Sequence, residues 1–416
     1  MTASGSTTPR ATSDVVVDGF THGGEGVARL DGKAVFVAGA LPGERITVEI
    51  TEDRKRWARG RLVDVIEPAE GRTEPPCPYA HECGGCDLQH ATPETQRDLK
   101  TRVVVEQLER IGRLVDPPVE GCRPVGPDDG YRTNAQLHAD TDGRLGYYRA
   151  GSHDVVPVDR CLVLTPATQR VKDEIGNATG ADVVAVRAHQ TTQTAVAVLH
   201  PGPGPLAMPA GDVDVALAQP DGTTVPMRGD GVLREQVSGL TFEFGPSAFF
   251  QVNTGGAEAI VAEVLDAAGD VGGALVWDLY AGVGLLSLPL ARAGAEVVAV
   301  EGHAAAAEWA RTNAEANGLD VMVLTADVRD HVTGDHADPP DVVVLDPPRT
   351  GAGEDVAATL AALRPGTIVY VACDPAALAR DAKVLEGAGY RLTKAVPLDL
   401  FPMTHHVEVV ATFRSA

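Results

Sequence analysis

The 416-residue sequence lacks several features that would have placed it in particular protein classes. It contains no apolar run of about 18 or more residues, which argues against a membrane-spanning helix. The first residues, MTASGSTTPRATSD, are small and polar and have no apolar stretch of the kind a secretory signal needs. Aromatic residues make up only 4% of the chain, so we expect cores built from Ala, Val and Leu. These absences predict a cytoplasmic protein with no membrane partner, and its length predicts two or three domains.

The sequence also lacks an excess of basic residues. With 58 acidic and 35 basic residues, its formal net charge is −23. An acidic surface repels phosphate, so composition alone argues against nucleic-acid binding, and we expect no DNA partner. One stretch, EDRKRWARGRL (52–62), gathers five cations around Trp57. Taken by itself, this stretch is typical of a solvated strand edge.

The N-terminal part predicts a small β-barrel. We expect residues 1–12 to form a disordered tail. Residues 13–67 contain five short alternating runs separated by Gly-rich turns, and this pattern is typical of a small all-β barrel.

In the remaining chain, the pattern of expected strands and helices changes at about residue 245. Residues 68–245 are β-rich, with one helix expected over 92–112, capped by Thr92 and a candidate to pack on the C-terminal domain. From 246 to 416, Ala-rich helical segments alternate with apolar strands. This alternation predicts a doubly wound, mostly parallel sheet, so the whole chain is expected to be a multidomain α/β protein.

Three of the six cysteines fall within CPYAHECGGCDLQH, residues 77–90. A disulfide is disfavoured in a chain without a secretory signal, and three cysteines would leave one unpaired. Zinc could be held by these three thiolates with His81 or His90. An iron–sulfur cluster would require a fourth, distant cysteine. The local stretch leaves zinc and iron–sulfur both open.

The C-terminal half has sequence features that are typical of a site for a nucleotide-containing cofactor. DLYAGVG (278–284) ends a predicted strand and opens a helix with glycines, and Glu301 ends the next strand, where it could bond a ribose hydroxyl. These features suit either a nicotinamide dinucleotide or S-adenosylmethionine. Ser287 stands where a dinucleotide fingerprint has its third Gly, which weakens the hydride-transfer interpretation.

Two further strand ends favour S-adenosylmethionine. Asp327 follows the third predicted strand, near the expected position of an adenine amino group. Asp346 and two prolines follow the fourth, in VVVLDPPR (342–349). Such a turn is typical of methyltransferases that hold a planar base against the cofactor, although prolines also make a rigid turn for structural reasons alone.

Cys373 and Glu408 form a possible nucleophile and base. Cys373 lies between an apolar strand and a helix that begins near Pro375, so we expect the helix dipole to lower its pKa. A lone Cys at a strand end is otherwise often an inert buried thiol. Glu408 lies on the last strand, where burying a charge without purpose would be costly. A thiolate adding to C6 of a pyrimidine makes C5 nucleophilic, and a carboxylate can then remove the C5 proton.

At this point the chain resembles the S-adenosylmethionine-dependent RNA uracil-C5 methyltransferases of the type with a TRAM domain and an iron–sulfur cluster. The resemblance covers nearly the whole chain. It rests on a TRAM-like barrel (13–67), CxxxxxCGGCxLQH (77–90), SAFFQVN (247–253), DLYAGVGLLSLPLA (278–291), LDPPR (345–349), ACDPAALARD (372–381) and FPMTHHVE (401–408).

The resemblance implies roles for particular residues. Cys373 would be the nucleophile and Glu408 the base, and Phe249 would pack on a nucleobase. A [4Fe–4S] cluster would be held by Cys77, Cys83, Cys86 and Cys161. The cofactor and base pocket would be lined by Gln251, Tyr280, Leu285, Glu301, Asp327 and Asp346, with Leu285 contributing only its backbone.

Two positions depart from the family pattern without removing a catalytic group. Asp374 stands where Asn is common, and Ala281 stands where Cys is usual. Cys122 matches no motif. These departures affect loop hydrogen bonding rather than the class of reaction.

The implied reaction is methyl transfer from S-adenosylmethionine to C5 of one uridine in a structured RNA, through a covalent Cys–C6 adduct. The barrel with its basic run favours a structured RNA. With the barrel and the cluster both present, 23S rRNA is the expected substrate, and a T-loop uridine of tRNA is the alternative. The uracil would have to be flipped out to reach Cys373. A radical RNA-modifying enzyme and a non-catalytic RNA-binding iron–sulfur protein are weaker interpretations. We expect a monomer, with a cluster that ties loops together rather than transferring methyl groups.

Overall fold

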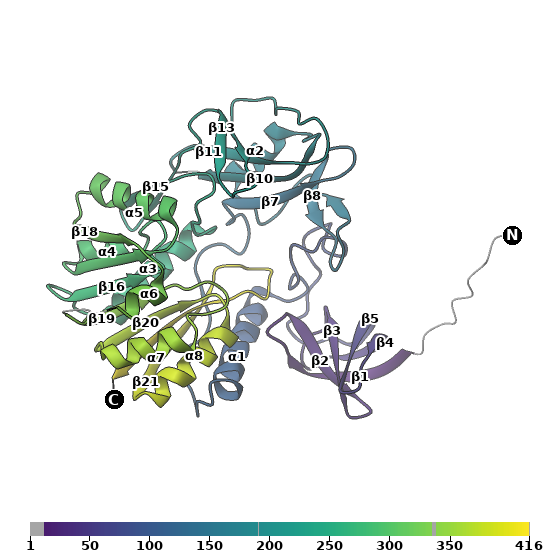
Figure 1. The fold of residues 1–416 in the computed structure, drawn as a ribbon. Helices are drawn as coiled ribbons and strands as arrows, with labels where there is room; N and C mark the ends of the chain where they lie inside the picture. Colours follow the sequence, from purple (N-terminus) through teal and green to yellow (C-terminus); the bar gives the residue numbers. More distant parts are fainter. Residues whose placement is uncertain (1–11, 190, 335–337, 416) are drawn as a thin grey trace.

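The computed structural model describes residues 12–189, 191–334 and 338–415, so most of the expected N-terminal tail lies outside the described residues. Three bodies follow one another along the chain: a small barrel, a central sheet and a larger sheet covered by helices (Figure 1). Among the helices of the described ranges, none is both long and apolar enough to cross a membrane.

The first body is a closed barrel with the strand order β1-β2-β3-β5-β4. Its inner positions hold small apolar side chains such as Val35 and Val48, both fully buried. Asp31 and Gly32 have φ of 49° and 78°, which suits the tight turn between β2 and β3. The expected small barrel is confirmed, with strands β1 Thr12–Phe20, β2 Glu25–Leu30, β3 Lys33–Ala38, β4 Arg45–Asp53 and β5 Trp57–Glu67.

The central body is a seven-stranded sheet with the order β13-β12-β11-β10-β7-β8-β9. Helix α2 (Pro166–Ile175) packs on one face, where Val171 and Ile175 meet Leu137 and Val184 in a single core. Because side chains alternate along a strand, the neighbours of these residues point to the other face. The strands are β7 Asn134–Ala139, β8 Leu145–Tyr148, β9 Val155–Pro157, β10 Ala181–His189, β11 Thr194–Pro201, β12 Asp214–Ala218 and β13 Thr224–Arg228.

The third body is an eight-stranded sheet with the order β18-β17-β16-β19-β20-β22-β21-β6. Its first five strands are parallel, and β22 and β21 are joined to them in antiparallel pairs. The doubly wound arrangement is confirmed. The strands are β6 Arg123–Pro124, β16 Leu275–Leu279, β17 Glu296–Glu301, β18 Val321–Thr325, β19 Val342–Leu345, β20 Thr367–Ala372, β21 Tyr390–Asp399 and β22 Glu408–Ser415.

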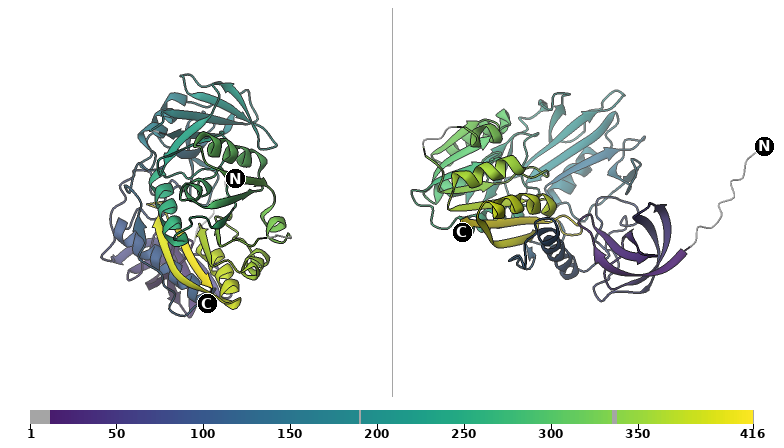
Figure 2. Two further views of the ribbon diagram at one scale, coloured as in Figure 1. Left: turned by 90° about the vertical axis from the view of Figure 1, so that its left-hand side faces the viewer. Right: turned by 60° about the horizontal axis from the view of Figure 1, so that its bottom comes forward.

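Helices cover both faces of this sheet and create two separate cores. One core contains residues of α3, α4 and α5, and the other contains residues of α1, α6, α7 and α8. The central body lies against one side of this layered unit, and the barrel lies beside α1 (Figure 2). The helices are α1 Pro93–Arg110, α3 Thr254–Ala268, α4 Ser287–Arg292, α5 Ala304–Ala316, α6 Val328–Val332, α7 Glu354–Leu363 and α8 Pro375–Gly387.

Segments that precede residue 246 also belong to the catalytic unit. Val104 and Leu108 of α1 are buried in the core that contains α8, and β6 pairs with β21. The hairpin of β14 (Leu233–Val237) and β15 (Leu240–Phe244) packs into the other core. The third body is therefore assembled from more of the chain than its C-terminal part.

Helix α1 begins as its sequence predicts. Thr92 has an extended backbone and its side chain accepts a hydrogen bond from Thr95 N, while Pro93 occupies the first turn. Lys100 of this helix is 2% exposed, and its ammonium group pairs with the buried Asp399 at the end of β21. This buried ion pair fixes α1 against the loop that leads to β22.

Candidate active site and cysteine cavity

Cys373 and Glu408 lie opposite each other at the carboxyl end of the sheet. Strands β20 and β22 are antiparallel, and Ala372 faces Val409 in their register. Continuing the register by one residue places Cys373 opposite Glu408, at a separation where cross-strand side chains interact. Two residues that are 35 positions apart in the sequence are thus brought together by ordinary strand pairing.

Glu408 is held in an environment that disfavours its charge. Its side chain is 3% exposed, and its Oε1 has no hydrogen-bond partner among the described residues. Burial and the nearby Asp346 carboxylate raise its pKa well above the ordinary value, and Arg349 opposes this shift. A buried carboxyl group with a free oxygen is suited to accept or hold a proton from a bound substrate.

The prediction that the helix dipole lowers the pKa of Cys373 is wrong for the protein without substrate. Burial is the largest effect, and together with Glu408 and Asp346 it raises the pKa of Cys373 to about 11. The N-cap of α8 is Asp374, and its Oδ1 accepts the hydrogen bond from Ala377 N at 2.8 Å. Cys373 therefore lies one residue outside the cap, and a carboxylate already occupies the favourable end of the helix.

Most of the predicted cofactor residues line a small pocket next to this pair. Its volume is about 40 Å³. It is lined by five residues proposed from the sequence, namely Phe249, Gln251, Tyr280, Leu285 and Asp346. Phe249 is 70% exposed, so its ring is available to a partner, whereas Gln251 is buried.

The glycine loop after β16 shapes one wall of this pocket. Tyr280, Gly282 and Gly284 have φ of 62°, 57° and 96°. Gly284 has a backbone conformation that residues with a side chain rarely adopt, and a Cβ there would also lie 2.6 Å from Leu288 Cδ1, so both features favour Gly. Tyr280 carries a left-handed backbone despite its side chain, which is the kind of local strain that gathers at ligand sites.

Glu301 and Asp327 lie at the expected strand ends but bond to the backbone. Glu301 Oε2 accepts from Gly282 N at 2.8 Å and its Oε1 accepts from His303 N at 2.6 Å. Asp327 caps α6 by accepting from Arg329 N and Asp330 N. In this structure neither residue lines the small pocket, and both hold the loops around it.

Asp278 is a pocket residue that the sequence reasoning missed. It is 1% exposed and lines the small pocket, with one carboxylate oxygen bonded by Ser287 Oγ and the other, Oδ1, without a described partner. Burial raises its pKa to about 7. The available signal was a carboxylate inside the apolar strand ALVWDLY.

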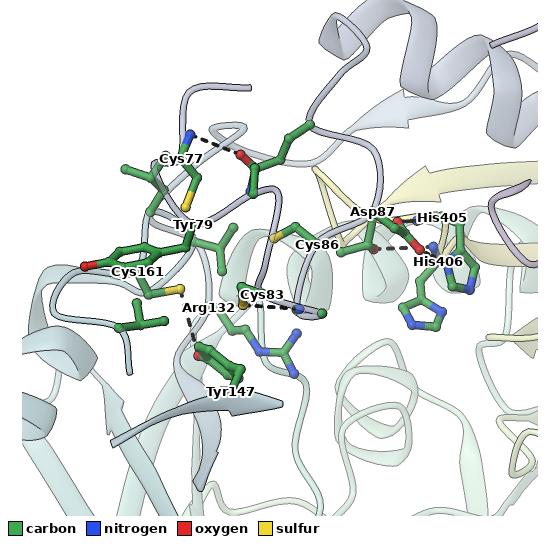
Figure 3. Close-up of a pocket in the computed structure, with 18 of the residues that line it drawn as sticks. Cys77, Tyr79, Cys83, Cys86, Asp87, Arg132, Tyr147, Cys161, His405 and His406 are labelled. Carbon is green, nitrogen blue, oxygen red and sulfur yellow. Dashed lines mark hydrogen bonds and ion pairs between the residues drawn. The ribbon is translucent and has the colours of Figure 1, made fainter. Parts of the chain in front are cut away.

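The four cysteines proposed as cluster ligands line one cavity of about 310 Å³. Figure 3 shows Cys77, Cys83, Cys86 and Cys161 around it, with His405 and His406 to one side. All four thiols are free and half-buried. Burial raises the pKa of Cys83, and that of Cys86 to about 12.

Hydrogen bonds orient the segments that carry these thiols. Gln89 Oε1 accepts from Cys77 N at 3.2 Å, and Gln169 Oε1 accepts from Cys161 N at 3.1 Å. Tyr147 donates its hydroxyl to Cys161 Sγ at 3.8 Å. Within the described ranges, no group of three or more His, Cys, Asp or Glu side chains converges closely enough to hold a single metal ion. Cys122 does not line the cavity.

Comparison with known proteins identifies the family. Sequence models match the TRAM domain at residues 6–63, the methyltransferase small domain at 240–364 and the tRNA (uracil-5-)-methyltransferase family at 339–414. The chain is 37% identical over 444 residues to the 23S rRNA (uracil(1939)-C(5))-methyltransferase RlmD of Alkalilimnicola ehrlichii, covering 98% of this chain and 97% of that protein. This chain belongs to the RNA uracil-C5 methyltransferase family.

Two further comparisons agree with this assignment. A Streptomyces avermitilis protein named uncharacterized RNA methyltransferase is 36% identical over 426 residues, covering 97% of this chain and 98% of its own length. The crystal structure of Pyrococcus abyssi tRNA (uracil-54, C5)-methyltransferase with S-adenosyl-L-homocysteine has a TM-score of 0.76 at 27% identity, covering 96% of this chain and 99% of that chain. The predicted TRAM domain and the S-adenosylmethionine-dependent RNA methyltransferase are confirmed.

Proposed function

We propose that this methyltransferase acts through a covalent adduct between Cys373 and C6 of its target uracil. The support is the facing pair of Cys373 and Glu408 beside the pocket that collects the cofactor residues. Cys373 Sγ, as thiolate, bonds to C6, and the electron pair of the C5–C6 double bond moves to C5. C5 then takes the methyl group, and S-adenosylhomocysteine leaves.

Glu408 completes the cycle in this proposal. Its carboxylate removes the proton from C5, the C5–C6 double bond re-forms, and the bond between C6 and Cys373 Sγ breaks. The thiolate is regenerated, and Glu408 later loses its proton to water. Phe249 is exposed beside the pocket and packs on a nucleobase, while Gln251, Tyr280, Leu285 and Asp346 surround the cofactor. Glu301 and Asp327 can bond to the cofactor while they hold these loops, because a carboxylate has about four acceptor sites and Asp327 uses only Oδ1 for its backbone bonds.

The covalent route is tested by separating addition from proton removal. With Glu408→Gln, the adduct forms but C5 keeps its proton, so we expect a protein–RNA complex that survives denaturing gel electrophoresis. With Cys373→Ala we expect neither the complex nor methyl transfer. Cys122→Ala is the matched control, because this half-buried thiol lies outside the pocket, and it should behave like the parent. Methyl transfer by Cys373→Ala would overturn the mechanism.

We propose 23S rRNA as the substrate, with the T-loop uridine of tRNA as the alternative. The first is favoured by the relative from Alkalilimnicola ehrlichii, whose name specifies 23S rRNA. The alternative is favoured by the Pyrococcus abyssi structure, whose description specifies tRNA. Mapping 5-methyluridine in both RNAs from a strain that lacks this gene would decide between them. Loss from tRNA alone would contradict the first choice.

We further propose that Cys77, Cys83, Cys86 and Cys161 hold a [4Fe–4S] cluster. The donor set fits, because four free thiols and no competing carboxylate cluster line one cavity among the described residues. A multi-iron cluster takes thiolates that stand farther apart than those around a single ion. When bound, the cluster would tie the loop before α1 to the central sheet.

Iron content tests this assignment. Protein purified without oxygen should contain iron and acid-labile sulfide in equal amounts. Cys161→Ala should lose both, whereas Cys122→Ala should keep both. Zinc in place of iron and sulfide would contradict the proposal.

A further inference from the structure

The segment of residues 246–254, which leads from β15 to α3, forms one wall of the small cofactor pocket. Phe249, Phe250 and Gln251 of this segment line the pocket. All residues of the segment are described and none belongs to a strand, and α3 begins only at Thr254. A loop of this kind has many accessible conformations, so other parts of the chain have to fix it before the pocket can form.

Arg187 of β10 fixes the beginning of this segment. Its side chain is 4% exposed, and its Nη1 donates to Pro246 O at 2.9 Å and to Ala248 O at 2.6 Å. The neighbouring Val186 and Ala188 belong to the core under α2, so Arg187 points to the opposite face of the central sheet. A side chain of the central body thus holds a wall of the cofactor pocket.

The same guanidinium group packs against two stacked rings next to the pocket. Its Cζ lies 5.2 Å from the centre of the Phe244 ring. Phe244 stacks on Phe250 with ring centres 4.6 Å apart and an angle of 8° between the planes. Because Phe250 lines the pocket, ring packing connects Arg187 to the pocket in addition to the hydrogen bonds.

Fold stability alone does not explain a charge at position 187. Among the described residues no carboxylate pairs with Arg187, and its Nε has no hydrogen-bond partner. Burial lowers its pKa to about 10, so it stays charged at neutral pH. A buried, unpaired cation costs free energy that an apolar side chain of similar length would avoid. What the guanidinium group provides instead is two N–H groups on Nη1, one for each carbonyl of the segment.

Two further contacts hold the end of the segment. Thr133, which precedes β7, donates to Val252 O from its N at 2.8 Å and from its Oγ1 at 3.1 Å. Glu235 of β14 pairs with His189 of β10 and accepts a hydrogen bond from Thr254 Oγ1 at 2.8 Å. Both ends of the segment are therefore fixed, and its middle lines the pocket.

We infer that Arg187 is a positioning residue for methyl transfer. It does not line the cofactor pocket itself. It holds the segment 246–254 in the conformation that presents Phe249 and Gln251 to the pocket. The inference rests on the proposal that this pocket takes S-adenosylmethionine. It adds that a wall of this pocket is completed by a residue of the central domain, outside the methyltransferase domain.

The test measures binding of S-adenosylhomocysteine to the full chain by calorimetry. Arg187→Met removes both N–H donors and should weaken binding about tenfold, because the conformation that binds becomes a minor population. Arg187→Lys keeps a charged donor and should weaken binding only about threefold. Arg228→Met is the matched control and should bind like the parent. Arg228 also donates to two backbone carbonyls of the central body, Val213 O at 2.8 Å and Pro209 O at 3.2 Å, and does not line the pocket.

Binding is measured well below the melting temperature of each variant, so that a loss of stability alone does not change the affinity. Deuterium exchange of residues 246–254 should rise in Arg187→Met and stay unchanged in Arg228→Met. Unchanged affinity in Arg187→Met, or an equal loss in both Met variants, would overturn the inference. If Arg187→Met does not fold, Arg187→Lys is compared with Arg228→Lys in the same way.

A variant of the pocket itself separates this inference from the proposed function on which it rests. Gln251→Ala removes a side chain that lines the pocket and should weaken binding of S-adenosylhomocysteine. Weaker binding in Gln251→Ala with full affinity in Arg187→Met would contradict only the role of Arg187. Full affinity in both variants would contradict the proposed cofactor pocket, and the inference with it.

Discussion

His22 of the barrel bonds directly to Asp374, the residue that follows the candidate nucleophile. Its Nε2 lies 3.1 Å from Asp374 Oδ2, across 352 positions of sequence. The pKa of Asp374 is lowered because backbone N–H groups and His22 favour its charged form, although burial opposes them. Gly24 of the same turn has φ of 82°, and a Cβ there would lie 3.0 Å from His405 Cβ. The turn between β1 and β2 thus lies between the two catalytic segments.

We predict that His22 positions Cys373 through Asp374. His22→Ala should lower kcat about fivefold and leave the KM for RNA nearly unchanged, because the lost half-exposed hydrogen bond positions the residue next to the nucleophile rather than binding RNA. His22→Gln keeps a donor and should recover most of kcat. Methyl transfer under saturating cofactor measures both constants. Asp64→Ala, at an exposed position on β5, is the control. An increase in KM alone would show that the turn acts in RNA binding instead.

Much of the architecture could be predicted because it depends on local patterns. The alternation in residues 13–67 and the glycines at 282 and 284 encode turns and strand ends directly. The pKa of Cys373 could not be predicted, because it depends on Glu408 and Asp346, which arrive from other strands. The contact of His22 with Asp374 could not be predicted either, because nothing in the sequence around these residues indicates where the barrel packs.

We predict that Asp346 sets the pH at which methyl transfer begins. Its carboxylate raises the pKa of both Cys373 and Glu408, so both hold their protons to higher pH than they would alone. Activity should therefore rise with pH. Burial raises the pKa of Asp346 itself to about 7, so its charge acts above neutral pH. In Asp346→Asn the rising part of the pH–rate profile above pH 7 should therefore move to lower pH by about one unit, because a like charge has been removed. Saturating S-adenosylmethionine must be used, since Asp346 also lines the cofactor pocket.

The kinetic measurement for Asp346 is the single-turnover rate from pH 5 to 9. The maximal rate is expected to fall in Asp346→Asn. The pH at which the rate rises reports the electrostatic effect separately from this fall. A rise at the same pH in both proteins would show that Asp346 does not influence the reacting groups.

Lys100 is predicted to stabilise the docking of α1. Its ammonium group and Asp399 are each 1% exposed on their side chains, and Lys100 Nζ also donates to Phe401 O at 3.1 Å. Lys100→Met would leave Asp399 charged and buried, with Arg97 as its remaining cation at 4.0 Å. We expect a loss of about 3 to 5 kcal/mol in the free energy of unfolding.

Urea denaturation followed by tryptophan fluorescence measures this loss. The control is Lys33→Met, which breaks an exposed ion pair with Asp53 in the barrel and should cost less than about 1 kcal/mol. The double change Lys100→Met with Asp399→Leu should recover much of the stability, because no buried charge is left unpaired. Equal effects of Lys100→Met and Lys33→Met would contradict the role of the buried pair.

Asp278 is predicted to make the stability of the catalytic domain depend on pH. Its pKa rises from 3.8 to about 7 on folding because the group is buried, so the folded state favours the protonated form. The stability that this proton provides is fully present below pH 4 and is lost as the pH rises through 7. Asn cannot titrate and keeps an oxygen for the hydrogen bond from Ser287. The melting temperature of Asp278→Asn relative to the parent should therefore be higher at pH 8 than at pH 5. Asp320→Asn, at an exposed position, should show no such change, and a constant difference for Asp278→Asn at both pH values would refute the prediction.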